Sequence, residues 1–172
     1  MKAYDAIITK ENIQNYFKQS GLTMGAFANL LGISKRWLEY LFSENENYEF
    51  TPNTVQKACD FFITDFRKFT TELQEAPFDL REILKKKHAK NTEYSKILSD
   101  APSVPFIIEK ILVKDEEFVN SSRLELRFIK RIIWKYHPEL MLTNLSSDLQ
   151  KSEFVVCEPH PTKANTNVYR KK

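Results

Sequence analysis

Apolar residues recur at helical spacing along most of the chain, and glycine, proline and polar capping residues interrupt them. The first stripe consists of Ile13, Tyr16 and Phe17. It predicts an amphipathic helix that begins at residue 10 or 11 and ends at Ser20, before a glycine. Similar stripes follow, so the pattern indicates a chain built mainly from short helices.

The stretch from Gly21 to Leu41 predicts two short helices joined by a glycine turn. Thr23 is a suitable N-cap for the first helix, and Gly32 ends it because glycine adopts the left-handed C′ conformation without a Cβ clash. Ser34 caps the second helix. The residues expected to be buried are Phe27, Ala28 and Leu31 in the first helix and Leu38 and Leu41 in the second. A helix-turn-helix of this kind presents its second helix to the major groove of DNA.

A polar loop over residues 43–48 separates these helices from a longer one. That helix starts near Thr51 and Pro52, and its apolar spacing extends to Leu73. The stripe consists of Val55, Cys59, Phe62, Phe66 and Phe69. Its first half closes the core of the two short helices, and its second half either packs against the next domain or forms a dimer contact.

Pro77 breaks this pattern, and residues 79–89 predict a short basic helix with an apolar face. The run from Lys85 to His88 forms either a solvated helix face or a phosphate contact. Prolines within 101–105 mark a linker. These signals divide the chain into an N-terminal domain over 1–76, a helical linker over 77–104 and a C-terminal domain over 105–172.

The C-terminal domain reads as three helices followed by a β-hairpin. The helices are expected over 106–118, 123–136 and 142–151. On the second helix, Leu124, Phe128, Ile132 and Tyr136 form the apolar face, flanked by Ile129 and Ile133. Two β-prone segments, 154–157 and 168–170, enclose a polar loop. This order predicts a winged-helix arrangement, in a chain whose overall class is mostly α.

Composition supports a folded helical protein. The 172 residues are 42% hydrophobic and 28% charged, with three glycines. No apolar run approaches the length of a membrane span, and the N-terminus lacks a secretory signal, so we expect a cytoplasmic location and no membrane contact. Cys59 and Cys157 are not expected to form a disulfide, and the three histidines show no metal-ligand spacing with them. We therefore predict no metal and no cofactor.

Charge is distributed unevenly along the chain. Residues 1–76 carry 8 Lys/Arg against 10 Asp/Glu, and residues 77–172 carry 18 against 13. Phosphate binding needs local positive charge, so the C-terminal half is expected to contribute to any nucleic-acid contact. A net charge of this size is also common in proteins that do not bind DNA.

The N-terminal stretch resembles the helix-turn-helix of the phage-repressor-like (Cro/XRE) proteins, which typically read Leu-Thr-Gln-x-x-Leu-Ala-x-x-Leu-Gly-Ile-Ser-x-x-x-Ile. The matching positions are Thr23, Phe27, Ala28, Leu31, Gly32, Ile33, Ser34 and Leu38. Met24 and Phe42 stand where the family usually has Gln and Glu. The resemblance covers about residues 13–62, and it implies a lambda-repressor-like helical domain whose second helix reads DNA.

A second resemblance lies near the C-terminus. Residues 146–155 followed by 167–169 are similar to the recognition helix and wing of winged-helix regulators, with Ser152 and Glu153 where glycine is usual. The two resemblances together imply DNA-contacting residues in both domains. These are Ser34, Lys35, Arg36, Trp37 and Tyr40 on the first recognition helix, Asn144, Ser147, Gln150 and Lys151 on the second, and Lys163, Asn165 and Arg170 in the wing. Arg and Lys suit guanine, and Asn and Gln suit adenine.

The sequence gives little support for a catalytic function. It contains no Gly-rich phosphate loop, no Cys–His pair and no Gly-x-Ser-x-Gly elbow. The leading hypothesis is a sequence-specific transcriptional regulator that binds double-stranded DNA as a homodimer. The alternatives are a protein-interaction adaptor with a degenerate helix-turn-helix, and a replication or plasmid-partition initiator.

Overall fold

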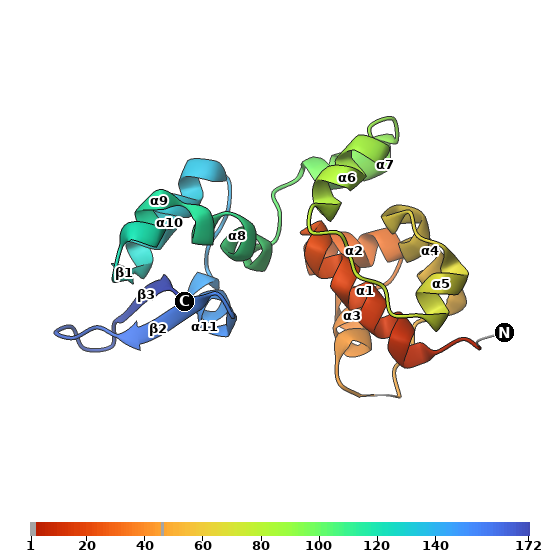
Figure 1. Cartoon of the computed structure of the whole chain (residues 1–172), viewed down its shortest axis with the longest axis horizontal. Helices are drawn as coiled ribbons and strands as arrows, with labels where there is room; N and C mark the ends of the chain where they lie inside the picture. The colour runs from red at the N-terminus through yellow and green to blue at the C-terminus, as the bar shows by residue number, and fades with distance from the viewer. Residues whose placement is uncertain (1–2, 46) are drawn as a thin grey trace. The chain divides into compact units, whose positions relative to one another are not determined.

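A computed structural model of the chain describes residues 3–45 and 47–172 (Figure 1). The protein is mostly helical, as the sequence predicts, with one small three-stranded antiparallel sheet. The chain divides into two compact units, unit 1 up to Asp100 and unit 2 from Ala101 to Lys172. Within the described ranges, none of the helices combines the length and the apolar character that crossing a membrane requires.

Unit 1 is entirely helical in its described part. Its helices are α1 (Ala6–Ser20), α2 (Met24–Leu31), α3 (Lys35–Phe42), α4 (Pro52–Phe62), α5 (Phe66–Thr71), α6 (Leu80–Lys87) and α7 (Thr92–Ser99). The predicted caps Thr23 and Ser34 accept backbone N–H bonds at the starts of α2 and α3. Thr51 does the same at the start of α4. Helix α1 begins earlier than predicted, because Asp5 accepts from the amides of Ile7 and Ile8.

The core of unit 1 is rich in aromatic rings. Phe27, Leu31, Leu38 and Leu41 are buried, as predicted. Around them, the ring of Phe17 stacks on Phe27 at 5.2 Å between centroids, and Tyr16 contacts Phe62 at 5.4 Å and Phe69 at 5.2 Å. Such pairs stabilise the core beyond their buried area.

The single helix expected from Thr51 to Leu73 is wrong. Ile63 takes a left-handed backbone conformation (φ 57°) and ends α4, and Asp65 then caps α5 by accepting from the amide of Lys68. The turn lets Phe62 and Phe69 both reach the core, whereas Leu73 is exposed. The apolar residues keep the 3.6-residue spacing across the turn, so the spacing alone does not show that one helix ends and another begins.

Helices α6 and α7 belong to unit 1, although the sequence analysis places residues 77–104 in a linker. Leu80 and Leu84 from α6 and Leu98 from α7 are buried in the same core as Phe27 and Phe62. His88, at the end of α6, donates from Nε2 to the backbone carbonyl of Phe61 at 2.7 Å. The unit therefore ends at Asp100.

Arg81 is a buried cation that joins three separate chain segments. Its guanidinium donates to the carbonyls of Ser20 at 2.8 Å, Leu98 at 3.0 Å and Asp100 at 2.7 Å. Ser20 is the last residue of α1, and Leu98 and Asp100 lie at the end of α7. A cation at helix C-termini is favourable because the last carbonyls lack partners within the helix. Arg81 thus ties α6 to α1 and α7.

Unit 2 combines helices with the sheet. Its elements are α8 (Val104–Lys110), the short 3₁₀ helix η1 (Leu112–Lys114), α9 (Glu116–Asn120), β1 (Leu124–Glu125), α10 (Leu126–Tyr136), α11 (Leu145–Lys151), β2 (Val155–Pro159) and β3 (Asn167–Lys171). The strand order is β1-β3-β2 and all pairs are antiparallel. The expected hairpin is present, and residues 160–166 form its loop (Figure 1).

Two details of unit 2 differ from the prediction. The first helix is interrupted at η1, and Asp115 caps α9. Strand β1, which was not predicted, takes Leu124 out of the second helix and pairs it with Tyr169. The buried face of α10 is therefore Ile129, Ile132 and Ile133, and Tyr136 is 48% exposed. These isoleucines pack with Leu145, Leu149 and Tyr169 in a second core.

Asp115 connects the start of α9 to the end of α10. Its carboxylate accepts from the Tyr136 hydroxyl at 2.7 Å and from Lys135 Nζ at 3.2 Å, while it caps the amides of Glu117 and Phe118. Burial alone would raise the pKa of Asp115, but the hydrogen bonds from Tyr136, Lys135 and the Phe118 amide outweigh burial and lower it.

We expect Arg81→Met to lower the free energy of unfolding of unit 1 by about 2–4 kcal/mol, because it leaves three carbonyls, two of them in buried hydrogen bonds, without their charged donor. Urea unfolding, followed through the indole NH signal of Trp37 in unit 1, measures the loss. The matched control is Lys86→Met on the exposed side of α6, which should change stability by no more than about 0.5 kcal/mol. Equal effects of the two substitutions would contradict this role.

The lowered pKa of Asp115 makes the stability of unit 2 depend on pH. A carboxyl whose folded pKa lies below its unfolded value stabilises the fold above that unfolded value, and the contribution disappears as pH falls through the folded pKa. Asp115→Asn should therefore destabilise unit 2 at pH 7 by about 1–3 kcal/mol, and the difference from wild type should shrink below about pH 4. The Trp134 indole signal reports this in urea. Glu116→Gln, an exposed neighbour, is the control.

Candidate nucleic-acid interface

Helices α2 and α3 of unit 1 are joined by a tight turn whose geometry is locally determined. Gly32 adopts the left-handed conformation (φ 73°), and Ser34 Oγ accepts from the amide of Trp37 at 3.1 Å. Leu38 and Leu41 pack one face of α3 into the core, and the exposed fractions of their side chains are 0% and 1%. The opposite side of α3 therefore faces solvent in a fixed orientation.

All five residues predicted for this helix lie on that exposed side. They are Ser34, Lys35, Arg36, Trp37 and Tyr40. Lys35 Nζ lies 4.0 Å from the carboxylate of Glu39, and Arg36 Nε donates to the Tyr40 hydroxyl at 3.1 Å. Exposed pairs of this kind are weak, so both cations remain able to exchange their partners for a phosphate or a base.

An aromatic cluster, formed by Trp37, Tyr40 and Tyr48, covers part of this face. Tyr48 stacks on Tyr40 at 5.5 Å between ring centroids, and Trp37 meets Tyr48 edge-on at 5.6 Å. Sequence reasoning missed Tyr48 because it lies in a segment read as a polar loop. The only available signal was an aromatic residue in an otherwise polar segment of the sequence.

The electrostatic surroundings of α3 are balanced. Residues 1–100 carry 14 Lys/Arg and 14 Asp/Glu. The loop after α3 adds the exposed carboxylates of Glu44 and Glu49, and Glu39 lies on the helix itself. Long-range attraction of a polyanion to this unit is thus small, and any contact would depend on Lys35 and Arg36 at short range.

In unit 2, α11 exposes the residues predicted for a second recognition helix. Leu145 and Leu149 are fully buried, so Ser147, Gln150 and Lys151 point outward. Asn144 directly precedes α11, and its side chain does not cap the helix. Gln150 Nε2 donates a long, weak hydrogen bond to Ser146 Oγ at 3.4 Å. Polar groups held loosely on a rigid helix are suited to base edges.

Two of the three predicted wing residues, Lys163 and Arg170, are held by carboxylates of unit 2. Lys163 Nζ is ion-paired and hydrogen-bonded to Glu125, and a guanidinium nitrogen of Arg170 lies 3.3 Å from Glu158 Oε1. Asn165 has a left-handed backbone (φ 53°) and shapes the turn. The wing therefore presents less unbalanced positive charge than its sequence indicates.

Glu125, which no pattern in the sequence singles out, organises the base of this wing. Besides Lys163, it lies 3.6 Å from His160 Nε2 and 3.5 Å from Arg127 Nε. The hydrogen bond from Lys163 is the main cause of the lowered pKa of Glu125. On its other side, the His160 ring accepts at Nδ1 from the amides of Thr162 and Lys163, both at 3.1 Å. These contacts fix the fold of loop 160–166.

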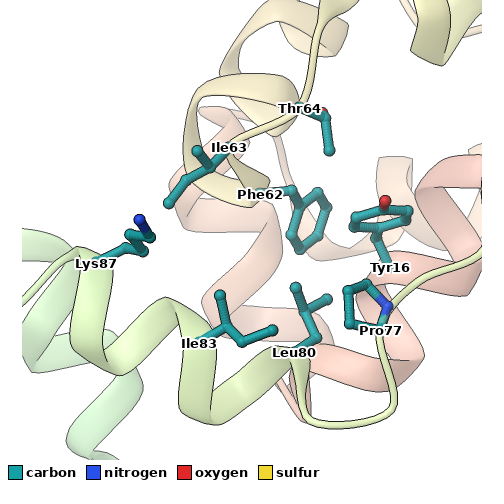
Figure 2. Close-up of a pocket in the computed structure, with 8 residues that line it drawn as sticks. All are labelled: Tyr16, Phe62, Ile63, Thr64, Pro77, Leu80, Ile83 and Lys87. Carbon is teal, nitrogen blue, oxygen red and sulfur yellow. The ribbon is translucent and has the colours of Figure 1, made fainter.

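A separate shallow recess of about 230 Å³ lies on unit 1 where α1, α4 and α6 meet (Figure 2). Its walls are mainly aromatic and aliphatic, and Lys87 is its only charged lining residue. The lining consists of Tyr16, Phe62, Ile63, Thr64, Pro77, Leu80, Ile83 and Lys87. Burial raises the pKa of Tyr16. This surface contains no arrangement of acid, base or nucleophile.

The described part of the chain contains no group of three or more His, Cys, Asp or Glu side chains placed to hold a metal ion. Cys59 is buried and Cys157 half-buried, and both are free thiols. Burial raises the pKa of Cys59, so its thiol stays protonated.

No family model matches the chain, and neither the curated proteins nor the solved structures contain a match to it.

We expect Glu125→Gln to loosen loop 160–166, because the neutral amide removes the ion pair to Lys163 and weakens the contact with His160. The amides of Thr162 and Lys163 should then exchange with deuterium about 3- to 10-fold faster. Glu153→Gln, which removes the same charge from an exposed position after α11, should leave the exchange of these amides unchanged. Slow exchange in both variants would show that backbone contacts alone hold the loop.

Proposed function

We propose that the protein is a sequence-specific DNA-binding regulator of transcription that acts in the cytoplasm. The observation that carries the proposal is the α2–Gly32–α3 unit, in which both helices are capped and packed and the whole predicted contact set on α3 is exposed. Together with the Cro/XRE-like sequence pattern, this supports a helix-turn-helix whose second helix, α3, enters the major groove.

Unit 2 supports a second DNA-reading module of the winged-helix type. Its order of helices and strands ends with α11 followed directly by a hairpin, as the winged-helix resemblance implies. In this proposal Asn144, Ser147, Gln150 and Lys151 contact bases or phosphates. Lys163, Asn165 and Arg170 lie along the DNA backbone, and Lys163 and Arg170 exchange their ion pairs within unit 2 for phosphates.

A homodimer is part of the proposal. A single α3 reads one half-site of a few base pairs, and regulators of this type gain affinity and specificity by placing two recognition helices one helical turn apart on symmetric DNA. The stoichiometry of the protein on its selected duplex, measured by light scattering, tests this element independently of affinity.

A second candidate, a protein-interaction module, is favoured by one specific observation, the aromatic cluster of Trp37, Tyr40 and Tyr48 within a charge-balanced unit. Exposed aromatic rings are typical anchors of protein interfaces. The two candidates differ in salt dependence, because the affinity for DNA falls steeply with salt whereas the affinity for an apolar partner surface does not. Replication or partition initiation would share the DNA-binding surfaces and differ only in the site selected.

The test is selection from a random 20-base-pair duplex library, followed by affinity measurements on the selected duplex and on a scrambled one. Arg36→Ala should weaken binding to the selected duplex by about 5- to 150-fold, which corresponds to about 1–3 kcal/mol for one base contact. Asn144→Ala/Gln150→Ala removes two such contacts and should weaken binding by at least about 30-fold. Binding to the scrambled duplex should change much less.

Lys96→Ala, an exposed cation on α7 of the same unit as Arg36, is the matched control and should leave the preference for the selected duplex intact. Failure of the library to yield a preferred sequence, or equal losses on both duplexes, would overturn the proposal of sequence-specific reading.

A further inference from the structure

The solvent face of α10 is the most strongly basic helix surface in the described structure of unit 2. Ile129, Ile132 and Ile133 bury one side of the helix. The opposite side carries Arg127, Phe128, Lys130, Arg131, Trp134 and Lys135, and the helix contains no Asp or Glu. We call these six residues the basic α10 face. None of them is among the residues predicted to contact DNA.

Phe128 holds two arginines in place on this face. The Arg127 guanidinium lies 4.6 Å from the centroid of the Phe128 ring, and that of Arg131 lies 5.7 Å from it. A guanidinium held over an aromatic ring loses conformational freedom but keeps N–H groups directed outward. Residues four apart on a helix are separated by about 6 Å along its axis, so two donor groups are offered side by side.

The cations of this face differ in how far their charge is already balanced. Arg127 lies 3.5 Å from Glu125, and Lys135 lies 3.2 Å from both Asp115 and Glu117. Within residues 3–45 and 47–172, no carboxylate is ion-paired with Lys130 or Arg131. These two adjacent residues therefore carry the unbalanced positive charge of the face.

We propose that the basic α10 face binds the phosphate backbone of duplex DNA, as a contact surface additional to α3, α11 and the wing. Lys130 and Arg131 make the main phosphate contacts, and Phe128 orients Arg131. This inference extends the proposed function, and it rests on that function because only the proposed function identifies the bound polyanion as DNA.

The contacts on this face favour a phosphate backbone over a lipid surface. Insertion into a bilayer needs apolar groups free to leave the protein. On the α10 face, Trp134 is tied to its own unit by a hydrogen bond from Nε1 to the Leu140 carbonyl at 2.9 Å, and Phe128 is covered by arginine. A row of cations with outward N–H groups instead matches phosphate oxygens, which accept charge-assisted and bidentate hydrogen bonds.

The experiment compares the full-length wild type with two double variants on the same scrambled 20-base-pair duplex, over a series of NaCl concentrations. The first, Lys130→Gln/Arg131→Gln, removes the proposed contacts. The second, Arg67→Gln/Lys68→Gln, removes an adjacent arginine and lysine from the exposed side of α5 and is the matched control for total charge. Amide exchange of α10 confirms that the first variant remains folded.

We expect the α10 variant to bind about 5- to 20-fold more weakly at 50 mM NaCl, with a salt slope smaller by about 1–2, because each phosphate contact contributes about 0.9 to that slope. The control should bind within about 2-fold of wild type. Equal affinities of the two variants would overturn the inference. Competition by polyglutamate as effective as that by DNA, at equal charge concentration, would also overturn it and identify an acidic protein segment as the occupant.

The outcome separates this inference from the function on which it rests. Loss of sequence preference in Arg36→Ala and Asn144→Ala/Gln150→Ala, with an unaffected α10 variant, would reject the α10 contact and leave the regulator. Weakening by the α10 variant alone would support the α10 contact and reject sequence reading by α3 and α11. Absence of duplex binding by wild type at low salt would reject both.

Discussion

The structure depends on one constraint, that helices this short do not persist by themselves. Helices α2 and α3 have eight residues each, well below the length at which an isolated helix becomes stable in water. Each therefore needs a side-chain cap at its start and a buried face, which Thr23 and Ser34 supply together with Phe27 and Leu38. The same requirement that makes α3 stable also fixes the direction of its exposed residues, so its stability and its presentation to a partner have a common origin.

Local signals were readable in the sequence, and signals that depend on distant partners were not. The caps and the glycine turn around α2 and α3 rest on contacts within a few residues, and these predictions are confirmed. Arg81 looked like one more residue of a basic helix, because the carbonyls of Ser20 and Leu98 that bind it lie elsewhere in the chain. Strand β1 has two residues and exists only because β3 pairs with it. Asp65 has a side chain suited to an N-cap, but the apolar period continues across it, so the spacing predicts one helix where there are two.

The charge balance of the candidate interface also depends on contacts between residues that are distant in the sequence. The count of lysines and arginines pointed to the C-terminal half, and the winged-helix resemblance pointed to Lys163 and Arg170 in the wing. In the part of the chain that the structure describes, however, Glu125 and Glu158 pair with Lys163 and Arg170, whereas Lys130 and Arg131 on α10 have no carboxylate partner. Which cations a polyanion can reach is decided by these tertiary ion pairs, and neither net charge nor spacing contains that information. The exposure of the predicted residues on α3 and α11 follows from their helical positions, but the balance of charge between neighbouring surfaces required the fold.

The three hydrogen bonds of Arg81 also set an order of events during synthesis. The end of α1 leaves the ribosome early. Arg81, which binds the Ser20 carbonyl there, also donates to the carbonyls of Leu98 and Asp100, which are synthesised much later. At about 5–20 residues per second, the 80 positions between Ser20 and Asp100 take about 4–16 s to translate. During that interval α1 to α5 can associate, but their core remains open on the side that α6 and α7 will cover. The nascent chain thus leaves the Phe61 ring, which His88 and Tyr94 later cover, open to solvent for seconds.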